Sequence, residues 1–87
     1  MSRLLKVKII TPEEVAYEGQ ALAVTIPAEA GQMQVYQGHV PVLARVVAGT
    51  IRIELPQAAP VSFEADAGFL RVTQNEVSLL IDQITAL

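Results

Sequence analysis

The sequence predicts an all-β protein, a two-sheet β-sandwich or flattened barrel of about nine to ten short strands. Apolar residues recur at every second position along most of the chain, which is typical of strands with one buried face. Turn-forming glycine, proline and asparagine residues interrupt these runs at intervals of roughly 8–12 residues, as expected between the strands of a sandwich. With 87 residues the chain has the length of one domain, so we expect residues 1–87 to form a single β-sandwich domain.

The strands are expected, in chain order, at residues 4–10, 14–18, 21–26, 32–36, 42–47, 50–55, 61–66, 69–73 and 77–83. The alternation that predicts them is clearest in three sets of residues: Leu5, Val7 and Ile9; Ile51, Ile53 and Leu55; and Val61, Phe63 and Ala65. Each set alternates with mainly polar or charged neighbours, so one face of each strand is expected in the core and the other outside.

Two segments depart from this pattern. Pro12-Glu13-Glu14-Val15 is the one helical candidate, with Thr11 as a possible N-cap, but it is too short to form more than a turn. Leu79-Leu80-Ile81 is apolar at three consecutive positions. Such a strand is either covered on both faces within the fold or lies beneath a partner, and both interpretations remain open.

The composition indicates a partner protein. Residues AVILMFWYC make up 52% of the chain and charged residues 17%, which is more apolar than ordinary globular domains. A small domain cannot bury that much apolar surface, so we expect an exposed apolar patch. The sequence has no run of about 18 apolar residues, the length that a spanning helix needs. The start of the chain is not a signal peptide, because it is polar at every second position. The net charge of −3, without a basic cluster, argues against nucleic acid and anionic lipid.

No pattern in the sequence indicates catalysis or a cofactor. His39 is the only histidine and there is no cysteine, which excludes a multi-histidine or thiolate metal site. No serine lies in a nucleophile elbow, and phosphate-binding glycine motifs are missing. The carboxylates expected on a solvated face include Glu64, Asp66, Glu76 and Asp82. We therefore expect a protein that is not an enzyme and binds no cofactor.

The stretch from Ala30 to Leu43 is expected to form a strand, a tight turn and a second strand. Gly38 can adopt a positive φ, and Pro41 keeps the preceding residue extended. His39, taken by itself, is interpreted as a turn histidine that bonds a nearby backbone carbonyl.

Gly38-His39-Val40-Pro41-Val42-Leu43 resembles the signature of the ATP synthase ε subunit, in which Gly-His-x-Pro precedes two aliphatic residues. Segments 5–13, 48–53, 67–72 and 76–82 resemble further strands of that family in the same order. Three glutamines depart from it: Gln32 stands where many members carry Glu, Gln34 where many carry Gly, and Gln37 where many carry Pro. The match extends over nearly the whole chain.

This resemblance implies a central-stalk rotor subunit of a rotary F-type ATP synthase. Such a subunit docks on the γ subunit and the c ring and couples proton- or sodium-driven rotation to ATP synthesis. It has no catalytic site and lies on the cytoplasmic side of the cell inner membrane as a peripheral part of the complex. Because the chain stops at Leu87, it is expected to be the N-terminal β-sandwich domain without the family's inhibitory C-terminal helices.

The resemblance also assigns contact residues. Those expected at the γ subunit are Gly38, His39, Val40, Pro41 and Val42. Those expected at the c ring are Glu29, Gly31, Gln32, Met33 and Gln34. The alternative hypothesis is a stand-alone β-sandwich adaptor that binds an unrelated protein. A small enzyme is the third class considered, and it lacks any general acid–base pair.

Overall fold

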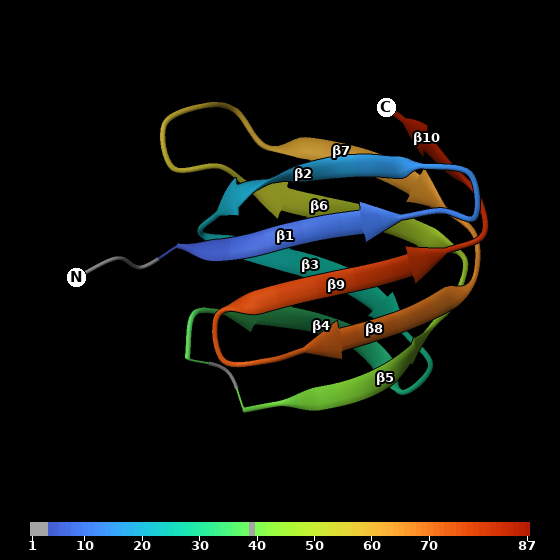
Figure 1. The fold of residues 1–87 in the computed structure, drawn as a ribbon, viewed down its shortest axis with the longest axis horizontal. Helices are drawn as coiled ribbons and strands as arrows, with labels where there is room; N and C mark the ends of the chain where they lie inside the picture. The colour runs from blue at the N-terminus through green and yellow to red at the C-terminus, as the bar shows by residue number, and fades with distance from the viewer. Residues whose placement is uncertain (1–3, 39) are drawn as a thin grey trace.

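Ten strands form two layers around an apolar core in the computed structural model, which describes residues 4–38 and 40–87 (Figure 1). The strands are β1 (Leu5–Ile10), β2 (Val15–Ala21), β3 (Ala23–Ala28), β4 (Gly31–Tyr36), β5 (Val42–Val46), β6 (Gly49–Glu54), β7 (Val61–Ala65), β8 (Gly68–Val72), β9 (Glu76–Ile81) and β10 (Ile84–Ala86). The described residues contain no helix. The prediction of an all-β sandwich or flattened barrel is confirmed.

One layer has the strand order β5-β8-β9-β1-β2 and the other β10-β7-β6-β3, with β4 paired to the outer edge of β3. β1 and β9 run parallel, and the other described strand pairs are antiparallel. β3 joins the two layers, because Ala23–Thr25 pair with β6 and Ala28 pairs with Val46 of β5. The sheet is thus continuous from layer to layer.

Three stretches of chain each supply one strand to each layer and bend between them. The bends lie at residues 47–48 between β5 and β6, at 66–67 between β7 and β8, and at 82–83 between β9 and β10. β7 pairs with β6 and β10 in one layer, and β8 pairs with β5 and β9 in the other. Backbone hydrogen bonds continue round the bend, where the Asp66 N–H donates to the Gln83 carbonyl at 3.0 Å and the Asp82 N–H to the Ala67 carbonyl at 3.4 Å. The layers are therefore connected by covalent chain as well as by side-chain packing.

Glycine and proline residues lie where backbones approach closely at the bends. A methyl group on Gly68 would overlap the Leu80 carbonyl oxygen, and one on Gly49 would lie 3.1 Å from the Pro27 ring. Pro27 lies in a central strand, where its missing N–H would normally cost a ladder hydrogen bond. Position 27 lies between the residues of β3 that pair with β6 (Ala23–Thr25) and the one that pairs with β5 (Ala28), and its carbonyl accepts a hydrogen bond from the Val47 N–H at 2.9 Å.

The alternation seen in the sequence fills the space between the layers. The largest fully buried side chains are Leu5, Val7, Ile9, Val24, Ile26, Val35, Val46, Ile51, Ile53, Leu70, Leu79 and Ile81. Within the described part of the chain no polar or charged residue is buried. On the side where β2 approaches β7, the Tyr17 and Phe63 rings meet edge to face with centroids 5.5 Å apart. An aromatic pair thus closes the sandwich where no strand pairing does.

Two sequence expectations are refined by the structure. The strand expected over 77–83 ends at Ile81, and a further short strand, β10, follows the bend. The segment after Thr11 is a turn, as expected, in which the Glu14 N–H donates to Thr11 Oγ1 at 3.3 Å and the Thr11 N–H to the Glu14 carbonyl at 2.9 Å. Leu79 and Ile81 are buried, whereas Leu80 is 48% exposed. The outward face of this strand is therefore not covered within the described fold.

Candidate functional site

The two candidate contact segments lie at the two ends of β4. The 29–30 turn leads from β3 into β4, and residues 37–41 lead from β4 to β5. Six residues of extended chain span roughly 17–20 Å, so the segments cannot form one site. In Figure 1 the first lies at the end that carries the bends, and the second lies at the opposite end, where β1 begins.

The segment expected at the γ subunit presents apolar groups to solvent. Gly38 has a φ of 82°, which confirms the positive φ expected at this turn. Val40 is 70% exposed and Pro41 is exposed, whereas Val42 is half-buried and packs against the core. His39 lies outside the described residues. Of this segment, therefore, Val40 and Pro41 are the apolar side chains most open to a partner.

The segment expected at the c ring is mainly polar. Glu29 is exposed, and its Oε2 lies 3.9 Å from Arg45 Nε. Gly31 has a φ of 125°, which allows the tight turn into β4. Gln32 is exposed on the outer side of the sheet, whereas Met33 is half-buried and packs against the core. The glutamine amide is thus open to a partner, and the thioether largely supports the fold.

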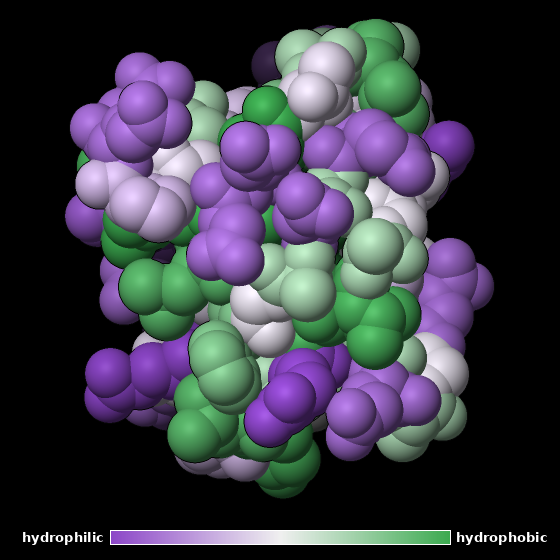
Figure 2. All heavy atoms as spheres, turned by 90° about the vertical axis from the view of Figure 1, so that its right-hand side faces the viewer, coloured by the Kyte–Doolittle hydropathy of each residue, from purple (hydrophilic) through white to green (hydrophobic). Residues whose placement is uncertain are grey.

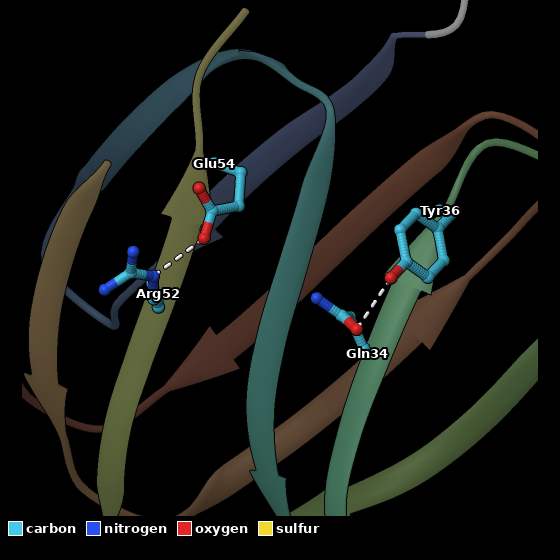
Figure 3. A network of polar contacts seen from close by, with 4 residues as sticks. All are labelled: Gln34, Tyr36, Arg52 and Glu54. Atoms are coloured by element: carbon cyan, nitrogen blue, oxygen red, sulfur yellow. Dashed lines mark hydrogen bonds and ion pairs between the residues drawn. The ribbon is translucent and has the colours of Figure 1, made fainter. Parts of the chain in front are cut away.

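Gln34 belongs to a hollow on the outer face of β3, β4 and β6 (Figure 3). The Tyr36 hydroxyl donates to Gln34 Oε1 at 2.7 Å, and Arg52 Nε donates to Glu54 Oε1 at 2.7 Å on the other side of β3. The hollow is lined by Leu22, Ala23, Gln34, Tyr36, Gln37 and Glu54. Its polar groups are the Gln34 and Gln37 amides, the Tyr36 hydroxyl and the Glu54 carboxylate.

The end of the molecule that carries the 29–30 turn presents both polar and apolar side chains (Figure 2). Figure 2 views this end and shows hydrophilic side chains scattered among apolar ones. The exposed acidic residues of the turns and bends there are Glu13, Glu14, Glu29, Asp66 and Asp82. Among residues 4–38 and 40–87 no group of three or more histidine, aspartate or glutamate side chains is placed to hold a metal ion. The same residues include no helix of the length and hydropathy that crossing a membrane requires.

Sequence reasoning expected an exposed apolar patch but did not locate it. The structure places Leu43, Phe69 and Leu80 on the outer face of neighbouring strands β5, β8 and β9, with exposures of 73%, 50% and 48%. The apolar run at residues 79–81 was the feature of the sequence that indicated part of this patch. The other two residues could not be added to it without the strand order, because they belong to segments far apart in the sequence.

A family model described as ATP synthase, Delta/Epsilon chain, beta-sandwich domain matches residues 4–86. The chain belongs to this ATP synthase δ/ε family. It is 30% identical over 83 residues to the ATP synthase epsilon chain of Chlorobium limicola, covering 95% of this chain and 94% of that one. It is 37% identical over 79 residues to ATP synthase epsilon chain 2 of Ralstonia nicotianae, covering 91% of this chain but 57% of that longer one. The resemblance inferred from the sequence is confirmed.

Solved structures share the fold. A chain of the Euglena gracilis mitochondrial ATP synthase, determined as an OSCP/F1/c-ring assembly, matches with a TM-score of 0.92 at 17% identity, covering 99% of this chain and 55% of that one. A chain from the central stalk and c ring of the Tetrahymena thermophila enzyme matches with a TM-score of 0.76 at 14% identity, covering 92% and 64%. The same fold is thus found where few residues are identical.

Proposed function

We propose that this δ/ε-family chain is a non-catalytic central-stalk subunit of a rotary F-type ATP synthase. Its β-sandwich, a single domain over residues 1–87, docks on the γ subunit and the c ring and couples ion-driven rotation to ATP synthesis. In that complex the subunit is peripheral to the inner membrane, on its cytoplasmic side. The observation that carries the proposal is the family match over residues 4–86. The names of the relatives and the assemblies that contain the structural neighbours support it.

The γ subunit is proposed to contact Gly38, His39, Val40, Pro41 and Val42. In support, Val40 is 70% exposed and Pro41 is exposed. Exposure of these apolar side chains to water is unfavourable, and a permanent partner would bury them. Burial of a branched aliphatic side chain contributes about 1.5–3 kcal/mol, so a few such groups suffice to anchor an interface. An apolar contact of this kind suits two rotor subunits that do not separate during rotation.

The c ring is proposed to contact Glu29, Gly31, Gln32, Met33 and Gln34. The exposed amide of Gln32 can both donate and accept hydrogen bonds to a polar loop. The carboxylate of Glu29 is held near Arg45 at 3.9 Å but remains exposed. A polar, hydrated contact at this end complements the apolar contact at the other end of β4.

The γ contact is tested by replacing Val40 with Asp. We expect the affinity for purified γ subunit to fall by about 2–4 kcal/mol, because the change places a charge in a desolvated contact. Leu87→Asp is the matched control, since Leu87 is 74% exposed, as Val40 is, and lies after β10. Isothermal titration of γ into each variant makes the measurement, with circular dichroism as the check on folding. Equal affinity of wild type and the Val40 variant would place the γ contact elsewhere.

The c-ring contact is tested by cross-linking in the assembled enzyme. A cysteine at position 32 should form a disulfide with a cysteine in the c-ring loop under mild oxidation. A cysteine at Gln57, exposed in the β6–β7 connection at the other end of the molecule, should not. If both positions cross-link equally, or if no position from 29 to 34 does, the assignment of this end to the c ring is wrong.

A further inference from the structure

The hollow on the outer face of β3, β4 and β6, here called the Ala23 pocket, is built by strand register. Ala23 forms its floor, with Tyr36 of β4 on one side and Glu54 of β6 on the other. Each of the three is adjacent in sequence to a core residue, so alternation turns its own side chain outward. Neighbouring strands lie about 4.8 Å apart, so roughly 10 Å separates the two flanking strands and leaves room above Ala23 for one side chain.

Hydrogen bonds hold the walls of the Ala23 pocket in place. The Leu22 N–H donates to the Glu54 carbonyl at 2.8 Å, which ties the β2–β3 corner to the end of β6. The Tyr36 hydroxyl donates to Gln34 Oε1 at 2.7 Å, and Arg52 Nε donates to Glu54 Oε1 at 2.7 Å (Figure 3). Side chains that are already held lose less conformational entropy when a ligand binds, so the pocket is prepared for an occupant.

The groups that line the Ala23 pocket favour a positively charged occupant. Glu54 is the one charged residue among them. Arg52 takes one oxygen of this carboxylate, and within residues 4–38 and 40–87 no side chain pairs with the other, Oε2. The Tyr36 ring is 53% exposed, so a cation can lie against its face. The Gln37 amide oxygen can accept a further hydrogen bond. A guanidinium or ammonium group would therefore find a carboxylate, a ring and an amide in one place.

The Ala23 pocket is continuous with the segment proposed to bind γ. β4 and β6 end, and β3 begins, at the end of the molecule where residues 37–41 lie (Figure 1). Gln37 lines the pocket and directly precedes Gly38 of the proposed γ contact. Leu22, at the rim, is 41% exposed and offers an apolar group beside the polar ones. A partner that covers Val40 and Pro41 therefore reaches the pocket by following the chain back through Gln37.

We propose that the Ala23 pocket takes an arginine or lysine side chain of the γ subunit, inserted above Ala23 between Tyr36 and Glu54. The inference rests on the proposed function and adds to it a specific site and the chemistry of the group that fills it. The occupant is a side chain of γ rather than a free cation, because the pocket adjoins the loop that γ is proposed to cover. Covering the pocket excludes water, which strengthens both the ion pair and the cation–π contact.

The two partners of the Arg52–Glu54 ion pair test the proposal, because they should respond in different ways. The dissociation constant for purified γ is measured at low and high salt for wild type, Glu54→Gln and Arg52→Gln. We expect Glu54→Gln to raise the constant about tenfold at low salt and to reduce its salt dependence, because it removes the charge but keeps the shape. Arg52→Gln should not raise the constant, because it releases Glu54 Oε1 for the incoming cation.

A second variant fills the pocket without changing its charge. Ala23→Leu should raise the dissociation constant about tenfold or more at both salt concentrations, because the larger side chain occupies the space above the floor. Ala86→Leu is the matched control, since Ala86 is an exposed alanine of β10 at the other edge of the same layer, and it should leave the constant unchanged. Circular dichroism confirms that each variant is folded.

Three outcomes would overturn the proposal, and they are distinguishable. If Val40→Asp weakens γ binding while Glu54→Gln and Ala23→Leu bind as wild type does, γ covers the loop alone. If Glu54→Gln and Arg52→Gln weaken γ binding equally, the ion pair supports the fold and receives no cation from γ. If wild type does not bind γ at all, the proposed function itself fails.

Discussion

At the scale of single residues, glycines set the closest backbone contacts of this fold. Gly38 needs its positive φ of 82° but has nothing within 4 Å of the position of a Cβ atom. Gly68 has an ordinary φ, but a Cβ atom there would overlap the carbonyl oxygen of Leu80 on the paired strand β9. One glycine is required by its local conformation and the other by a neighbour distant in sequence.

Alanine substitutions should distinguish these two requirements. Gly38→Ala should lower the free energy of unfolding by about 1–2 kcal/mol, the cost of a left-handed conformation for an L-residue. Gly68→Ala should lower it by about 3 kcal/mol or more, because backbone at the bend has to move. Urea unfolding followed by circular dichroism measures both. Equal losses would mean that the β8–β9 pair relaxes without cost.

The sequence predicted the first of these glycines but not the second. The turn at Gly38 is set by adjacent residues, so local reasoning sufficed. The clash at Gly68 depends on the antiparallel pairing of β8 with β9, which no local pattern reveals. The exposed apolar patch was hidden for the same reason, because Leu43, Phe69 and Leu80 come together only through strand register.

At the scale of elements, period-two alternation predicted the strands that pack on the core along their whole length. It missed β10, which has three residues and one half-buried apolar side chain, Ile84. The bend at Asp82–Gln83 was also unforeseen, since the preceding apolar run gave no sign of an end there. A strand this short depends on its neighbour, and β10 pairs with β7 from Ile84 to Ala86.

Alanine substitutions in β9 and β10 should differ in their effect on stability, because β9 packs on the core and β10 lies at the edge of its layer. Leu79 is fully buried, so Leu79→Ala should cost about 2–5 kcal/mol of unfolding free energy. Ile84 is only half-buried at the edge, so Ile84→Ala should cost about 1 kcal/mol. Chemical denaturation of both variants checks the order of the two values. A larger loss at Ile84 would show that β10 contributes more to the core than its exposure indicates.

At the scale of the whole molecule, the two layers share three chain segments and should not open separately. Native-state hydrogen exchange should give amides of β7 and β8 the same opening free energy, because one bent segment carries both strands. Amides of the peripheral strands β2, β4 and β10 should have lower opening free energies, since each of these strands pairs with only one neighbour. Two distinct values of the opening free energy, one for the amides of each layer, would contradict this expectation. Each layer would then open as an independent unit.

The bent strands have a mechanical consequence. In a sandwich held together by side chains alone, opposed tangential forces on the two faces would shear one sheet over the other. Here such a load passes along peptide bonds at residues 47–48, 66–67 and 82–83, and sliding would require the paired bends to break together. The resistance therefore comes from stiff covalent bonds and cooperative hydrogen bonds rather than from a deformable apolar contact. If γ and the c ring load this chain at the opposite ends of β4, as proposed, the torque passes through these bends with little elastic deformation.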